Sequence, residues 1–114
     1  MPREASDLLH GTLDVLVLKT LSWTPMHAFE IATWIADRSS GHFAVDDAAL
    51  MQALHRLEER ALVATEWGTT ENARRAKYYR LTTAGREHLR AETKRLTAYA
   101  DALTSVLAIR TARG

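Results

Sequence analysis

Residues 46–82 read DDAALMQALHRLEERALVATEWGTTENARRAKYYRLT, and they contain the two patterns from which the fold is predicted. Asp46 and Asp47 are good helix N-caps, and their charges favour a helix N-terminus. Behind them, apolar residues at helical spacing mark one face of a helix, namely Leu50, Leu54, Leu57 and Ala61. The opposite face is polar and carries Gln52, His55, Arg56, Glu59 and Arg60. This half of the stretch therefore predicts an amphipathic helix.

The second half of the stretch has the pattern of a β-hairpin. Leu62–Trp67 and Ala76–Leu81 are predicted strands, the first apolar with alternation and the second rich in tyrosine. Gly68–Arg75 is a polar connection between them. Three basic residues cluster at this loop, Arg74, Arg75 and Lys77, and Arg80 follows them.

Two more helices are predicted upstream. The first spans Gly11–Trp23 with Thr12 as its cap, and it ends before Pro25 because proline cannot continue a helix. The second runs from about His27 to Arg38 and stops at serine and glycine. The segment His42–Val45 alternates polar and apolar residues, as a short strand does.

A last helix is predicted from a Thr82 cap to about Arg110. Apolar residues follow it as a coiled-coil-like seam, and we predict that they form a homodimer interface: Leu89, Leu96, Tyr99, Leu103 and Val106. So small a domain cannot bury the whole stripe, so the distal half should pack on the last or first helix of a second subunit. The alternative is that the helix folds back on its own domain.

These elements predict a mainly α fold with a small β-hairpin. Three helices followed by a hairpin are the order of a winged helix-turn-helix domain, here residues 8–82, and residues 83–110 form a long C-terminal dimerisation helix. With 114 residues, the chain has no spare length for another core.

Composition argues against several classes of protein. There is no cysteine, so neither a disulfide nor a thiolate metal site can form. The five histidines lack paired ligand spacing and no glycine-rich phosphate loop is present, so we expect no metal, no cofactor and no enzymatic activity. The apolar stretch near the start is short and interrupted by charge, and no secretion signal precedes it. We therefore expect a cytoplasmic protein without membrane contact.

The basic hairpin loop is the first part of a candidate DNA-binding surface. The net charge is only +1, so any argument for nucleic acid must come from local placement. Arg74, Arg75 and Lys77 concentrate positive charge where a hairpin tip would meet phosphates. Taken alone they are most simply a solvated turn, but their position after three helices favours contact with the DNA backbone.

The polar face of the third helix is the second part. Gln52 has the geometry to pair with adenine and Arg56 with guanine. The simpler interpretation is that His55 and Arg56 serve solubility or pair with Glu58 and Glu59 along the helix.

The tryptophans Trp23, Trp34 and Trp67 are interpreted as core or interface anchors in preference to ligand platforms, because large aromatic side chains dominate burial energetics. They remain the natural candidates for a ligand pocket.

Several blocks of the chain resemble the PadR family of bacterial transcriptional regulators. They are LHGTLDVLVLK at 9–19, MHAFEI at 26–31, ALHRLE at 53–58 and RAKYYRLT at 75–82, followed by Gly85. The likeness covers residues 8–107. It implies a winged helix-turn-helix repressor that dimerises through its C-terminal helix and, in some members, binds a small hydrophobic effector between the subunits.

The chain departs from the family pattern at the start of the third helix. Where the family commonly has Gly-Ser-Leu-Tyr-Pro, this chain has Ala48-Ala49-Leu50-Met51-Gln52. The serine and tyrosine that usually help to hold the DNA backbone are absent, and Ala49 stands in the serine's position within the predicted DNA-binding set. Alanine also replaces the usual glycine at Ala28 and Ala61, which should favour continued helix at both places.

Two hypotheses follow for the function. The favoured one is a dimeric repressor that places two third helices roughly 34 Å apart on a near-palindromic site in double-stranded DNA. The alternative is a winged-helix module that binds protein through the same surface, with weak or no DNA binding; the salt dependence of DNA affinity distinguishes them.

Overall fold

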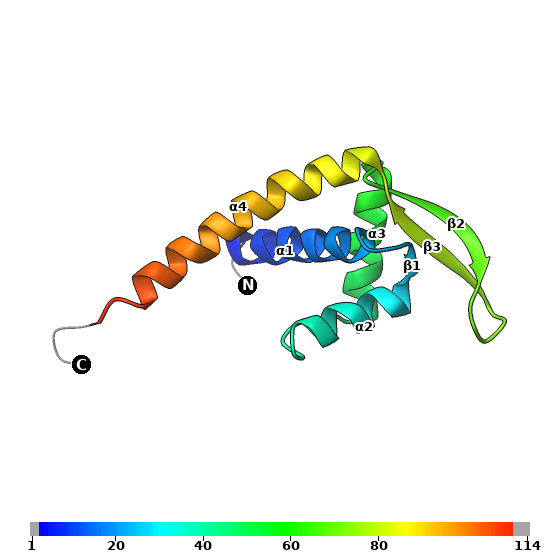
Figure 1. Ribbon diagram of the computed structural model, residues 1–114, viewed down its shortest axis with the longest axis horizontal. Helices are drawn as coiled ribbons and strands as arrows, with labels where there is room; N and C mark the ends of the chain where they lie inside the picture. Colours follow the sequence, from blue (N-terminus) through cyan, green and yellow to red (C-terminus); the bar gives the residue numbers. More distant parts are fainter. Residues whose placement is uncertain (1–2, 111–114) are drawn as a thin grey trace.

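The computed structural model describes residues 3–110, with side chains from residue 11 onward, and shows a small helical body from which a hairpin and a long helix project (Figure 1). The elements in chain order are α1 (Arg3–Leu21), β1 (Met26–His27), α2 (Ala28–Arg38), α3 (Asp47–Glu59), β2 (Val63–Thr69), β3 (Arg75–Leu81) and α4 (Thr83–Leu107). The prediction of a mainly helical fold with a small sheet is confirmed.

The sheet is antiparallel, with strand order β1-β3-β2. β2 and β3 form the predicted hairpin, which we call the wing together with its loop, residues 70–74. β1 pairs with the other edge of β3, where Met26 lies opposite Tyr79. This edge strand was not predicted, because two residues carry no detectable periodicity. It ties the start of α2 to the base of the wing.

α1 is the centre of the helical body. It packs against α2, α3 and α4, and in Figure 1 it runs between α4 and α2. The fully buried side chains include Val17 and Leu18 from α1, Ile31 from α2, and Leu54 and Leu57 from α3. The leucines of α3 are the ones whose spacing predicted its inner face, so the polar face of α3 is turned outward as expected.

Three of the helices, α2, α3 and α4, begin at side-chain caps. Asp46 and Thr82 cap α3 and α4 as predicted, and each side chain accepts a hydrogen bond from the backbone N–H three residues on, at 2.7 and 2.9 Å respectively. At α2, the His27 ring accepts from the Glu30 N–H while the Glu30 carboxylate accepts from the His27 N–H. This reciprocal pair is a capping box.

The end of α3 differs from the prediction. The helix stops at Glu59 because Ala61 adopts the left-handed conformation, with φ of +58°. The N–H groups of Ala61 and Leu62 donate to the carbonyls of Glu58 and Leu57 at 3.0 and 2.9 Å, which is the Schellman pattern. Glycine is usual at this position, since other residues pay about 1–2 kcal/mol there. The expectation that Ala61 would prolong the helix is therefore wrong.

The start of α4 is fastened to this same turn. The Thr82 hydroxyl donates to the Ala61 carbonyl at 2.8 Å, and the Thr82 N–H donates to the Leu62 carbonyl at 3.2 Å. Gly85 passes so close that a Cβ there would overlap the Leu62 carbonyl oxygen, so only glycine fits. We call these four residues the α3–α4 junction.

The start of α1 and the strand predicted at residues 42–45 differ from the prediction. α1 begins at Arg3, so Gly11 and Thr12 lie inside the helix and Thr12 is not its cap. Glycine disfavours a helix only weakly, and tertiary packing overrides that preference. Residues 42–45 form no strand; the His42 N–H donates to the Ser39 carbonyl at 3.1 Å, in the turn that follows α2.

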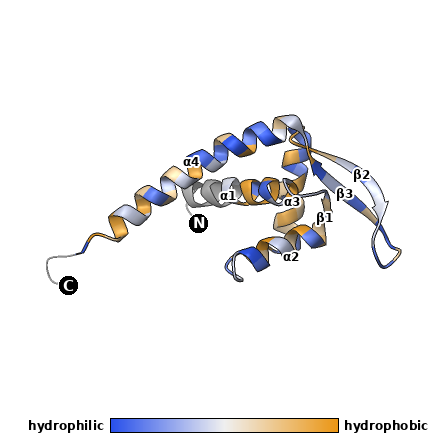
Figure 2. Ribbon diagram, viewed as in Figure 1, coloured by the Kyte–Doolittle hydropathy of each residue, from blue (hydrophilic) through white to orange (hydrophobic). Residues whose placement is uncertain are grey.

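α4 projects well beyond the helical body. Figure 2 shows hydrophobic residues recurring along its distal half, and every residue from 97 to 110 is exposed. Nothing in the described part of the chain covers this stretch of the helix.

Candidate nucleic-acid interface

The outward face of α3 carries an exposed strip. Gln52 and His55 are exposed at its centre, with Met51 and Arg56 at its two edges. These four residues line a shallow hollow of about 400 Å³. Gln52 has no hydrogen-bond partner among the described residues, and His55 pairs only with the exposed Glu59 one turn on, at 3.1 Å. The strip is therefore available to an outside ligand.

Arg56 already has a partner within the chain. Its guanidinium donates to both carboxylate oxygens of Asp14 on α1, at 2.7 and 3.5 Å, and both side chains are half-buried. Such a bidentate pair has stronger hydrogen bonds than a neutral pair. The predicted pairing of Arg56 with Glu58 or Glu59 is absent, and its contact with guanine stays a prediction. The ion pair with Asp14 fixes the angle of α3 on α1.

The wing presents two unpaired arginines. Arg74 and Arg75 are exposed at the loop, and neither forms an ion pair with any described residue. The Arg75 guanidinium lies over the Trp67 ring at 4.5 Å, which holds it on the surface of the hairpin without neutralising its charge. The loop itself is closed by the hydrogen bond from the Ala73 N–H to the Thr70 carbonyl, at 2.9 Å.

Lys77, the third predicted phosphate contact, has an internal partner. Its ammonium group lies 3.2 Å from the Glu58 carboxylate, which also accepts from the Thr65 hydroxyl at 3.3 Å. These contacts join α3 to both strands of the wing. Lys77 therefore fixes the wing against α3, and its charge is partly offset before any phosphate arrives.

Tyr79 lies beneath this cluster and is almost fully buried. Burial raises the pKa of its hydroxyl above the ordinary value of 10; the nearby Lys77 lowers it and Glu58 raises it. The Tyr79 side chain is therefore uncharged at neutral pH.

Family comparison identifies this arrangement. A model described as the transcriptional regulator PadR-like family matches residues 17–91. The chain belongs to this family. The matched segment contains all of α2, α3 and the wing, together with the α3–α4 junction. The resemblance recognised in the sequence is confirmed.

Solved PadR structures share the fold. A PadR family regulator from Eggerthella lenta is 27% identical, covers 94% of this chain and 91% of its own, and superposes with a TM-score of 0.73. A PadR-like regulator from Bacillus cereus is 18% identical, with 91% and 99% covered and a TM-score of 0.77. An uncharacterised protein from Lysinibacillus sphaericus is 29% identical over 84 residues, which are 74% of this chain and 77% of that one.

At the start of α3, this PadR chain departs from the family pattern and has small apolar side chains beside acidic ones. Ala48 and Ala49 have short side chains without polar groups, while Asp46 and Asp47 place negative charge at the helix N-terminus. Ala49, predicted as part of the DNA-binding set, is half-buried and carries no polar group. This end of α3 offers no side chain that would hold a phosphate.

Sequence reasoning missed Phe29. This apolar residue lies in the second predicted helix, and its side chain is 77% exposed. Its place two residues before the buried Ile31 puts it about 200° around α2, on the outer side, whereas Ile35 lies only about 40° from Ile31. That helical spacing was the signal that could have found it.

The predicted dimer seam divides into two parts. Leu89 is 8% exposed and belongs to the core of this chain, and Leu96 packs partly against that core, so both already have partners. Tyr99, Leu103 and Val106 are exposed. Only the distal three residues present free apolar surface that a second subunit would cover.

The three tryptophans differ in burial. Trp23 and Trp67 are exposed, so neither is a core anchor, whereas Trp34 is half-buried and packs against the core. A role of Trp23 and Trp67 as interface anchors stays a prediction. Trp34 lines a small hollow of about 240 Å³ with Leu16, Ile35 and Phe43. Arg38 lies over the rings of both Trp34 and Trp23, at 5.2 and 6.0 Å.

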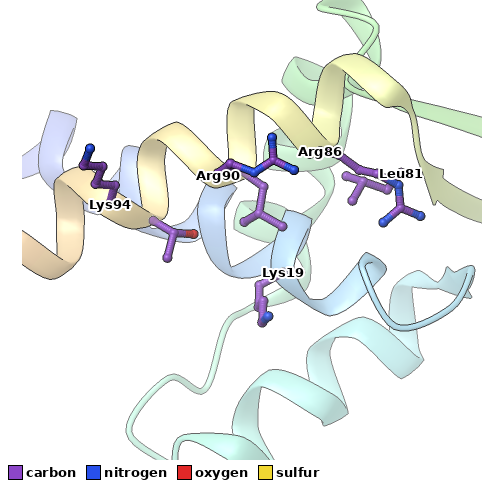
Figure 3. Close-up of a pocket in the computed structure, with 7 residues that line it drawn as sticks. Lys19, Leu81, Arg86, Arg90 and Lys94 are labelled. Atoms are coloured by element: carbon purple, nitrogen blue, oxygen red, sulfur yellow. The ribbon is translucent and has the colours of Figure 1, made fainter.

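A third hollow, of about 400 Å³, lies between α1 and α4 and has basic residues at its rim (Figure 3). Lys19, Arg86, Arg90 and Lys94 all contribute to it. Figure 3 shows that they splay apart: Lys19 points away from α4, and Lys94 points outward from the helix. They do not converge on a common point, as the donors of an anion site would.

No helix within residues 3–110 is long and apolar enough to cross a bilayer. Among residues 11–110, whose side chains the structure describes, no group of three or more histidine and carboxylate side chains is placed to hold a metal ion.

Proposed function

We propose that this PadR-family regulator is a dimeric repressor that binds double-stranded DNA with α3 and the wing. The observation that supports it best is that α3 carries an exposed strip, whose central Gln52 has no hydrogen-bond partner among the described residues, and that the wing carries two arginines without an ion pair. A base-reading helix beside a basic hairpin is the arrangement by which winged helices contact the major groove and the adjoining backbone.

The residues have distinct roles in this proposal. Arg74 and Arg75 bind phosphates and supply sequence-independent affinity. Gln52 pairs with adenine, and His55 contacts a neighbouring base or phosphate. Arg56 and Lys77 act indirectly, because their ion pairs with Asp14 and Glu58 set the angle between α3 and the wing.

Dimerisation through the distal part of α4 is supported by its exposed seam of Tyr99, Leu103 and Val106. A two-fold contact covers the apolar faces of both subunits at once. The dimer then places two α3 helices about one DNA turn, roughly 34 Å, apart, and the operator is near-palindromic.

Relief by a small hydrophobic effector completes the proposal. The hollow beside Trp34 and Phe43 is apolar and small, and it suits a planar apolar compound. A bound compound would quench tryptophan fluorescence and loosen DNA binding. A screen of such compounds that gives no saturable quenching removes the effector and leaves the repressor.

The decisive test is selection from a random DNA pool followed by a salt titration of the selected site. We expect one enriched, near-palindromic sequence, bound with a steep salt dependence. Arg74→Ala with Arg75→Ala should weaken binding to all DNA alike and flatten the salt slope by about one unit per lost phosphate contact. Arg90→Ala with Lys94→Ala removes the same charge from α4 and should leave the slope unchanged.

Sedimentation tests the dimer. Leu103→Asp places a charge within the apolar seam and should shift the protein toward monomer, with weaker operator binding through lost bivalency. Thr97→Asp puts the same charge on the same helix, roughly 120° away around the helix from Leu103. It should stay dimeric. A Leu103→Asp protein that remains dimeric at low micromolar concentration excludes this interface.

The alternative function, a protein-binding module, is favoured by one observation: Asp46 and Asp47 put negative charge at the start of α3. A chain that enriches no sequence from the pool, and shows no salt-dependent DNA binding, would have this function instead.

A further inference from the structure

Two large apolar side chains lie exposed beside the strip of α3. Phe29, at the start of α2, is 77% exposed, and Met51, on α3, is 47% exposed. Isolated exposed apolar residues are common on soluble proteins and need no explanation. These two, however, line one hollow of about 320 Å³, whose other lining residues are the apolar Ala28 and Leu50 and the charged Asp47.

Met51 connects this hollow to the strip. It also lines the hollow that contains Gln52, His55 and Arg56, so the apolar surface and the base-reading surface are continuous. Gln52 is the next residue of α3, and a ligand that reaches its amide will also meet the Met51 side chain. The partner of Met51 is therefore the partner of Gln52.

The chemistry of this end of α3 decides which part of DNA it can face. Asp46 and Asp47 repel phosphates, and Ala48 and Ala49 have no side-chain donor to offer them. A contact with the DNA backbone is therefore unfavourable here, so in the proposed complex this end of α3 faces base edges. Small side chains also let the helix approach the floor of the groove closely. The apolar feature that base edges present in the major groove is the 5-methyl group of thymine.

We infer that Met51, backed by Phe29, reads the 5-methyl group of a thymine next to the base pair that Gln52 contacts. Phe29 shields the far side of the methyl group from water, and the flexible thioether of Met51 adapts to its position. This inference rests on the proposed function, and it names two residues that set its sequence preference.

The test replaces thymine by uracil, which removes only the methyl group, at each position of the selected site in turn. With the wild-type dimer, one position per half-site should lose about fourfold in affinity, which corresponds to one buried methyl group. Met51→Ala should bind the thymine and uracil sites equally. Met51→Leu, which keeps an apolar side chain of similar volume, should retain the discrimination.

Phe29→Ala should reduce the discrimination, while Ile109→Ala, an equally exposed apolar truncation at the other end of the molecule, should leave it unchanged. A protein that selects a site but binds its uracil versions equally well overturns this inference and leaves the repressor standing. So does a Met51→Ala variant that still discriminates. A protein that binds no DNA overturns both.

Discussion

Ala61→Gly should stabilise the protein, although it removes a methyl group. Ala61 holds φ at +58° at the end of α3, and its side chain is exposed, so the methyl group contributes little packing. An alanine pays about 1–2 kcal/mol to adopt this conformation. Glycine pays nothing there, but its greater freedom in the unfolded chain costs about 0.4–1 kcal/mol.

Subtracting the midpoints of these two ranges leaves a net gain of about 0.8 kcal/mol. For a domain of this size that corresponds to a rise in Tm of about 2–6 °C. Thermal unfolding followed by far-ultraviolet circular dichroism measures it, at one fixed protein concentration because the Tm of a dimer depends on concentration.

Ala91→Gly provides the matched control, since Ala91 is exposed in the interior of α4. The same substitution in right-handed helix should lower stability by about 0.5–1 kcal/mol. If Ala61→Gly is no more stable than the wild type while Ala91→Gly behaves as expected, then α3 does not end in a left-handed turn at Ala61. The account of the α3–α4 junction would then be wrong.

Three further changes test other parts of the structure. Gly85→Ala should cost at least about 2 kcal/mol on chemical denaturation, because its Cβ overlaps the Leu62 carbonyl and α4 must shift; a stability within error of wild type would contradict the junction. Asp47→Asn should raise affinity for DNA of any sequence about three- to tenfold at low salt, because it removes a charge that repels phosphates; unchanged affinity would place the start of α3 away from DNA. The raised pKa of Tyr79 means that its contribution to stability is complete below about pH 10 and is lost as pH rises through the higher, folded-state pKa. Tyr79→Phe should therefore lose less stability than wild type above about pH 10, measured by denaturant titration across that range.

Periodicity accounts for what the sequence could predict of the fold. The leucines of α3, its Asp46 cap and the Thr82 cap of α4 are local signals, and the structure contains all three. Ala61 was misread because alanine favours helix, while the left-handed turn is imposed by the arrival of α4 at Thr82 and Gly85. Thr82 and Gly85 are more than 20 residues along the chain, so the local pattern around residue 61 does not indicate their contact with it.

The candidate site shows the same limit. Arg56 and Lys77 have the side chains that bind DNA, and only tertiary structure reveals that Asp14 and Glu58 already hold them. Gln52, Arg74 and Arg75 stay candidates for DNA contact, as predicted, because no described residue forms a hydrogen bond with the Gln52 side chain or an ion pair with either arginine. Phe29 was missed because apolar residues occur around much of α2, and a spacing of only two residues separates the outward Phe29 from the buried Ile31.

The α3–α4 junction also makes α4 a lever. Because one turn ends α3 and anchors the first turn of α4, the two helices cannot rotate independently at that point. At 1.5 Å per residue α4 is about 37 Å long, so a tilt of about 5° at its base moves its far end by about 3 Å. In the proposed dimer the far ends of the two α4 helices are held together, so a movement at those ends is transmitted back to α3. A sliding movement of a few ångströms between the two α4 helices then rotates each α3 helix. This rotation changes the separation of the two half-sites that the dimer can span.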